Sequence, residues 1–202
     1  FWRADAVREK TKSPFELAIG AVRSLHGTIE QPYQLYAWVT RMGEKKYYYQ
    51  APTGFPDKGA YWINTGSLLN RMNFGLALAS GRIPGVSIDL VALNNGHEPE
   101  SSQAALITYG KIILPERNLD ATMKRLMPML NDPALAQKVD EASMKVAAPA
   151  GQGDEMEMDE KGGKRRAARS VLEPMNSAAA TGNPMLAQVV GIIIGSPEYQ
   201  RR

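Results

Sequence analysis

Residues 13–27 read SPFELAIGAVRSLHG, and this stretch carries a full set of signals for one helix. Ser13 followed by Pro14 is typical of a helix start, because serine caps free backbone N–H groups and proline suits the first turn. Glu16 stands three residues after Ser13 and completes a capping box. Gly27 is expected to end the helix. The core-facing side is predicted to hold apolar residues at helical spacing, namely Phe15, Ala18, Ile19, Val22 and Leu25.

The same pairing of a capping residue with proline recurs at Asp132-Pro133, Asn183-Pro184 and Ser196-Pro197. Each pair predicts a helix start. Pro128 is expected to kink one of the later helices or to end it early. Apolar periodicity predicts helices over about 32–42, 66–80, 101–113, 119–130, 133–146 and 184–195, the last apolar nearly all round and therefore buried.

The predicted fold class is mainly α, an irregular multi-helix domain with an aromatic-rich ordered loop and one long disordered insert. Residues 1–146 are expected to form the helical domain and 147–182 a low-complexity charged insert. Residues 183–202 form a C-terminal helix and tail that pack back on the domain. The insert is predicted because 147–182 holds opposite charge runs and almost no large apolar side chain. Glycine and proline punctuate 43–64, which predicts a loop with at most a short hairpin.

Composition excludes several kinds of site. The 202 residues include no cysteine, so disulfides, thiolate nucleophiles and thiolate zinc sites are impossible. Only two histidines are present. His26 fits the end of the first helix, and His97 lies in a polar turn that is typical of a solvated loop. No metal ligand and no catalytic residue is assigned. Nucleotide cofactors are not expected, because neither a phosphate loop nor a complete dinucleotide fingerprint is present.

Charge and hydropathy limit the partners. The net charge is +3, and the densest basic run, 161–169, directly follows the acidic run 154–160. Nucleic-acid binding needs a concentrated basic face, so no nucleic-acid partner is expected. The longest apolar run, 189–194, contains Gly191 and is far shorter than the roughly 20 residues that span a bilayer. No membrane span is expected.

The aromatic residues give the most concentrated signal. Ten of the 15 aromatic residues fall within 33–74, beside prolines, glycines, Asn and Arg. Rings on a loop offer stacking faces to sugars or proline-rich ligands, and Asn and Arg supply oriented hydrogen bonds. The alternative is that Tyr33, Tyr36, Trp38, Trp62 and Phe74 simply fill the core. The candidate binding residues are Tyr47, Tyr48, Phe55, Trp62, Asn64, Arg71 and Asn73.

Four separated motifs resemble the C-terminal part of the bacterial family known as domain of unknown function 1800. They are KSPFEL at 12–17, PTGFPD at 52–57, the segment 62–74 with WIN and LNRMNF, and GSPEYQRR at 195–202. Phe55 stands where the family often has tryptophan. Phe1-Trp2 looks like the end of another family motif, so the chain is expected to be a fragment of a longer protein. The resemblance implies a mostly helical, exported protein, often encoded beside a sulfatase-like partner family, and carries over no catalytic residues.

Three functions remain open at this point. The leading hypothesis is a non-catalytic exported binding or assembly module that engages a glycan or a protein through 43–74. The alternative is a fragment of a hydrolase-like enzyme whose other catalytic groups lie in an N-terminal half. An enzyme predicts that Asn64, Arg71 and Asn73 converge in one pocket with a perturbed ionisable group, together with Asp57 or His97. A binding module predicts an open aromatic surface. In the third hypothesis, 43–74 is structural core.

Overall fold

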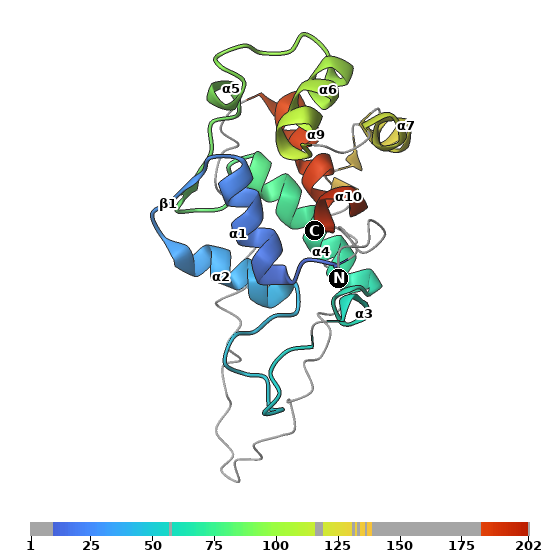
Figure 1. The fold of residues 1–202 in the computed structure, drawn as a ribbon. Helices are drawn as coiled ribbons and strands as arrows, with labels where there is room; N and C mark the ends of the chain where they lie inside the picture. Colours follow the sequence, from blue (N-terminus) through green and yellow to red (C-terminus); the bar gives the residue numbers. More distant parts are fainter. Residues whose placement is uncertain are drawn as a thin grey trace.

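The computed structural model describes residues 10–56, 58–115, 119–130, 132, 134–135, 137–138 and 183–201. Within this part the chain is mainly α-helical, as predicted (Figure 1). The helices are α1 (Pro14–Ser24), α2 (Pro32–Arg41), α3 (Gly59–Trp62), α4 (Thr65–Ala79), α5 (Leu90–Leu93), α6 (Ser102–Ile113), α7 (Leu119–Leu130), α9 (Pro184–Gly195) and α10 (Pro197–Gln200). Two short strands, β1 (Thr28–Ile29) and β2 (Val86–Ser87), pair antiparallel with Thr28 opposite Ser87.

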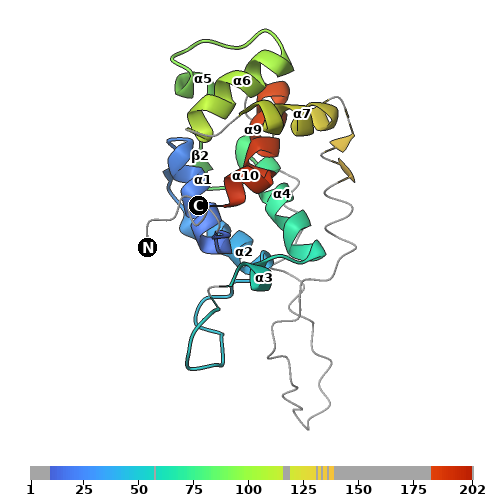
Figure 2. The ribbon, with the colours of Figure 1, turned by 45° about the vertical axis from the view of Figure 1, so that its right-hand side comes forward.

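The centre of the fold is the contact between α4 and α9, which lie side by side in both views (Figures 1 and 2). Their backbones approach closely because glycines face each other. A Cβ atom on Gly75 would lie 2.7 Å from the carbonyl oxygen of Gly191, and one on Gly191 would lie 2.8 Å from Cα of Leu76. Helix α9 is buried almost throughout, as its sequence predicts. Helices α1 and α2 lie on one side of this pair, and α6 and α7 lie on the other.

The N-terminal segment pairs with the C-terminal one. The N–H of Lys12 donates to the carbonyl oxygen of Gln200 at 2.7 Å, and Thr11 and Arg201 form an isolated β-bridge. The ammonium of Lys12 lies 3.7 Å from the centre of the Tyr199 ring. Residues 183–201 therefore pack back on the helical body, and the start of α1 is held against the end of α10.

The helix starts predicted at Ser13, Asn183 and Ser196 are confirmed, and the capping box of Ser13 and Glu16 is complete. Two details of the prediction were wrong. Phe15 is exposed, because the buried face of α1 is formed by Leu17, Ala18, Ala21, Val22 and Leu25. The left-handed residue after α1 is His26, with φ of 52°, rather than Gly27.

Two further predictions concern Pro128 and the loop at 43–64. Helix α7 continues through Pro128 to Leu130, so it does not end early, and the predicted kink stays a prediction. The described part of 43–64 is mostly an irregular loop, as predicted, and it contains the short helix α3 and no strand. The predicted insert 147–182 lies outside the described residues, as does most of the predicted helix 133–146.

Candidate functional site

The loop between α2 and α3 projects from one end of the helical body, below α2 in both views (Figures 1 and 2). Its base is fixed by Glu44, which is only 3% exposed. Oε2 of Glu44 accepts a hydrogen bond of 2.7 Å from the N–H of Phe15 in the first turn of α1, and Oε1 forms an ion pair with Lys46. A carboxylate at a helix N-terminus is stabilised by the helix dipole. Glu44 therefore joins the loop to the start of α1.

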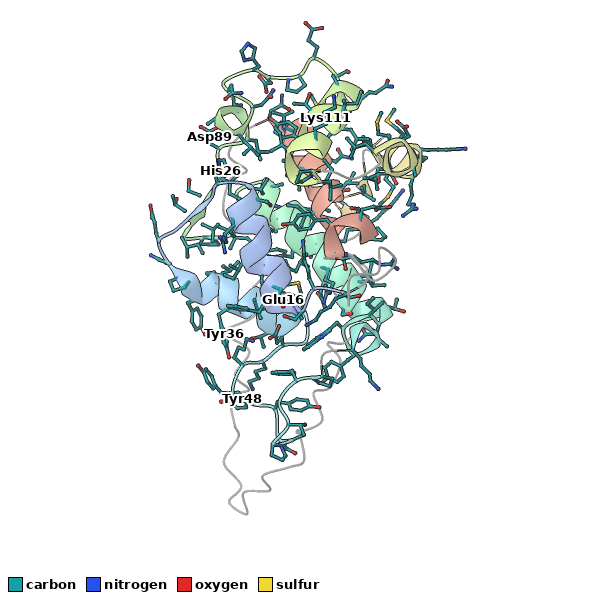
Figure 3. The ribbon with its side chains drawn as sticks, viewed as in Figure 1. Glu16, His26, Tyr36, Tyr48, Asp89 and Lys111 are labelled. Atoms are coloured by element: carbon teal, nitrogen blue, oxygen red, sulfur yellow. The ribbon has the colours of Figure 1, made fainter. Side chains whose placement is uncertain are left out.

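Tyr47 and Tyr48, here called the tyrosine tip, present their rings to solvent. Tyr47 is fully exposed and has a φ of 66°, a left-handed conformation that is unfavourable for a bulky residue. Tyr48 is 66% exposed, and the ammonium of Lys45 lies 3.7 Å from the centre of its ring. Figure 3 shows Tyr48 on the loop that projects below the helices. The tip thus combines two exposed phenol rings, one of which holds a cation over one face.

Behind the tip, four aromatic rings pack on one another. Phe55 lies 4.6 Å from Tyr49 and 5.5 Å from Trp62, measured between ring centres, and Tyr61 lies 4.8 Å from Trp62. Trp62 is buried and Phe55 is partly buried. Burial also raises the pKa of Tyr61. This cluster stiffens the loop, and Trp62 is almost wholly buried within it.

A cleft of about 290 Å³ opens between the base of the loop and the start of α1. Its volume is at the lower end of the range for small-molecule sites. Lys46, Phe55 and Trp62 come from the loop region, and the segment before α1 supplies hydroxyl groups and a second lysine. The full lining is Lys10, Thr11, Ser13, Glu16, Glu44, Lys46, Phe55, Pro56 and Trp62.

Arg71 lies completely buried on α4 behind this segment. Its Nη2 donates a hydrogen bond of 3.0 Å to the carbonyl oxygen of Lys12, and its Nη1 lies 3.5 Å from Oε1 of Gln200. Burial lowers the pKa of Arg71 to about 10, while the nearby Glu44 acts in the opposite direction. The guanidinium therefore stays charged at neutral pH, and it joins α4 to the N-terminal and C-terminal segments.

Asn64 and Asn73, the two asparagines among the predicted binding residues, have different surroundings. Asn64 is the N-cap of α4: its Oδ1 accepts from the N–H of Ser67 at 2.8 Å, and Oγ of Ser67 accepts from the N–H of Asn64. Asn73 is buried in the middle of the same helix. The structure thus brings Phe55 and Trp62 to the cleft and places Tyr47 and Tyr48 on the tip. Asn64, Arg71 and Asn73 do not line the cleft.

A family model described as "Protein of unknown function (DUF1800)" matches residues 1–201. The chain belongs to the DUF1800 family. No curated protein and no solved structure was found to match it.

In this DUF1800 chain, three of the four motifs that carry the resemblance line the cleft. Ser13 and Glu16 of the first motif, Phe55 and Pro56 of the second and Trp62 of the third line it directly. The fourth motif pairs with the segment that forms its wall, through the bond from Lys12 to Gln200 and the bridge from Thr11 to Arg201. Sequence reasoning missed Glu44, although it is the one acid in the basic and aromatic stretch 43–56.

The histidine turn lies at the opposite end of the DUF1800 chain, between α5 and α6 (Figure 1). Nδ1 of His97 lies 3.1 Å from the carbonyl oxygen of Asn95, and the amide of Asn94 donates to the carbonyl oxygen of His97. The described residues include no group of three His, Cys, Asp or Glu side chains placed to hold a metal ion. None of the described helices combines the length and apolarity needed to cross a membrane.

Proposed function

We propose that this DUF1800 chain is a non-catalytic binding module that engages a glycan through the tyrosine tip and the adjoining cleft. The observation that carries this proposal is the exposure of Tyr47 and Tyr48 on a loop whose base is fixed by Glu44. Aromatic rings that face solvent lower the solubility of a protein. Contact with a partner would explain why they are exposed. The left-handed backbone of Tyr47 adds a strain of the kind that accumulates at binding sites.

The chemistry of the projecting loop favours a glycan over a protein surface. Beyond its tyrosines, the described exposed residues of 45–54 are Lys, Gln, Ala, Pro, Thr and Gly, with no large aliphatic side chain. Phenol rings supply flat faces for the C–H surfaces of sugar rings, and lysines and hydroxyl groups supply donors. Protein interfaces usually centre on a larger fully apolar core.

The ionisable groups near the cleft support binding rather than catalysis. Glu44 and Glu16 accept hydrogen bonds from backbone N–H groups at the start of α1, and Arg71 holds the two terminal segments together. Each of these charged groups already stabilises the fold. His97, the other residue considered for an enzyme, lies at the far end of the molecule.

The test measures, by affinity electrophoresis, the binding of the 202-residue chain to a panel of soluble polysaccharides. The double variant Tyr47→Ala and Tyr48→Ala is expected to weaken binding at least about tenfold, since exposed anchors of this kind carry much of the binding energy. Tyr33→Ala is the matched control, because Tyr33 on α2 is 60% exposed, close to the value for Tyr48. Its binding should be unchanged.

The panel consists of extracellular polysaccharides, in keeping with the exported location that the family resemblance implies. Equal binding of the tip variant and the parent chain would overturn the proposal. So would failure of the whole panel. If the tip variant instead loses binding to a purified sulfatase-like partner, the function is assembly with that protein.

A further inference from the structure

In the cleft, the carboxylate oxygens that could accept hydrogen bonds already have partners, whereas hydrogen-bond donors can still reach a ligand. Oε2 of Glu44 accepts from Phe15, Oε1 of Glu44 pairs with Lys46, and Oε2 of Glu16 accepts from the N–H of Ser13 at 3.0 Å. Oγ of Ser13 accepts from the N–H of Glu16, which leaves its own hydrogen free to donate outward. The side chain of Lys46 remains 36% exposed. A ligand that enters the cleft therefore meets ammonium and hydroxyl donors.

The loop around the cleft is basic on its surface. Lys45 and Lys58 are exposed, and neither takes part in an ion pair within the described residues. Glu44 is the one acid described between residues 43 and 63, and it is buried and paired. Asp57, the other acid of this stretch, lies outside the described residues. The surface that the described residues of this stretch display is thus complementary to negative charge.

We propose that the glycan is a carboxylate-bearing polysaccharide, with sugar rings on the tyrosine tip and carboxylates facing Lys45 and Lys58. This inference rests on the proposed glycan binding and names its ligand class. Rings alone bind neutral and acidic sugars alike. Ammonium groups that have no carboxylate partner add attraction for the acidic sugar, and they leave the affinity for a neutral sugar unchanged.

The test compares two polymers with the same backbone, polygalacturonate and its fully methyl-esterified form. Polygalacturonate is expected to bind about fivefold more tightly or better, as two exposed charge pairs would allow. The difference should shrink as salt rises, because exposed charges are screened beyond a Debye length of roughly 8 Å at physiological ionic strength. Isothermal titration at low and high salt measures both effects.

The charge variant is Lys45→Gln with Lys58→Gln, which leaves the buried pair of Glu44 and Lys46 intact. It should bind the acid and the ester equally. The matched control is Lys111→Gln with Lys124→Gln, two exposed lysines of α6 and α7 that change the net charge by the same amount. Figure 3 shows Lys111 at the end of the molecule opposite Tyr48. This control should keep the preference for the acid.

The possible outcomes separate the two proposals. Equal binding of acid and ester by the parent chain overturns the acidic ligand and leaves glycan binding in place. Loss of the preference in both lysine variants overturns it too, because the effect is then one of net charge. Binding of dextran sulfate or poly-glutamate as tight as that of polygalacturonate also overturns it, by showing attraction for any polyanion. If neither form of the polymer nor any other glycan binds, both proposals fall.

Discussion

Nη2 of Arg71 on α4 lies 3.0 Å from the carbonyl oxygen of Lys12, although 59 residues separate the two in sequence. The same guanidinium reaches Gln200, 129 residues further along the chain. One buried cation thus connects the middle of the chain with the segments before α1 and after α10.

Replacement of Arg71 by leucine is expected to lower the free energy of unfolding by about 2–4 kcal/mol, because the carbonyl of Lys12 and the amide of Gln200 lose a partner while buried. Urea denaturation followed by circular dichroism measures the change. Arg23→Leu, at an exposed position of α1, should change stability by less than about 0.5 kcal/mol. Equal effects of the two variants would show that the Arg71 contacts do not hold the segments together.

Gly191→Ala is expected to destabilise the chain by about 1–3 kcal/mol, because its Cβ would overlap the backbone of Leu76 and force α4 and α9 apart. The matched control is Gly20→Ala within α1. There a Cβ would meet only Oη of Tyr199, at an ordinary 3.7 Å. That control should be neutral or should stabilise by up to roughly 1 kcal/mol, since glycine is costly inside a helix. Thermal unfolding of both variants is the measurement, and a tolerated alanine at 191 would contradict the close packing.

Local signals explain how much of this fold is readable from the sequence. The starts of α1, α9 and α10 depend on a capping side chain and a proline within four residues, so they could be predicted. The burial of α9 follows from its apolar surface. Partners distant in sequence could not be predicted, because nothing near Arg71 indicates Lys12 or Gln200.

In the candidate site, too, local features could be predicted from the sequence and contacts between distant residues could not. An aromatic loop was predictable from the density of rings. Which rings face solvent was not, since Tyr47 and Trp62 belong to the same stretch and differ only in where the chain turns. Asn64 drew attention as a polar residue near aromatics, but its position three residues before Ser67 is equally a capping signal. The burial of Glu44 depends on α1, which lies 29 residues earlier at Phe15.

Asn64→Ala tests whether this asparagine acts as a helix cap or as a ligand contact. Loss of the cap should cost about 1 kcal/mol of stability, because the N–H of Ser67 loses its acceptor. Binding of the polysaccharide identified in the panel should stay within about twofold of the parent value, allowing for a change of a few tenths of a kcal/mol. Asn64→Asp restores the acceptor and should recover the stability. A loss of binding that Asn64→Asp does not recover would assign Asn64 to the ligand.

The burial of the Tyr199 phenol predicts that the chain loses stability at alkaline pH. Burial raises its pKa, partly offset by the hydrogen bond with Ser24. Oη of Tyr199 and Oγ of Ser24 lie 3.0 Å apart, within hydrogen-bonding distance. The unfolded chain, with the ordinary phenol pKa of 10.0, releases the phenol proton first as the pH rises. The stability is therefore fully present below pH 10 and is lost as the pH rises through the higher pKa of the folded state.

Tyr199→Phe removes this proton, so its stability should fall less between pH 9 and pH 11 than that of the parent chain. At pH 7 it should be less stable by roughly 1 kcal/mol, for the lost hydrogen bond. Urea midpoints at the three pH values measure the effect. Tyr33→Phe, at an exposed position, should follow the parent chain. Parallel pH curves for the parent and Tyr199→Phe would show that another group controls alkaline unfolding.

Tyr47→Gly is expected to stabilise the chain and to impair its binding. A left-handed residue with a side chain costs roughly 1–2 kcal/mol, and glycine avoids this cost. The fully exposed ring of Tyr47 has little packing to lose. The greater freedom of glycine in the unfolded chain offsets about 0.5–1 kcal/mol, so a net gain of about 0.5 kcal/mol remains. Urea denaturation measures the stability, and affinity electrophoresis with polygalacturonate measures the binding.

Tyr48→Gly provides the comparison that makes this result interpretable. Tyr48 does not have a positive φ, and its ring holds the ammonium of Lys45, so glycine there relieves no strain and removes a contact. Tyr48→Gly should therefore lose stability and binding together, whereas Tyr47→Gly separates them. A natural residue that costs stability where glycine would not is explained by its function. If Tyr47→Gly proves less stable than the parent, the ring of Tyr47 packs against other groups in solution, and the tyrosine tip is not available to a ligand. If it binds polygalacturonate normally, the strain at Tyr47 serves something other than the glycan.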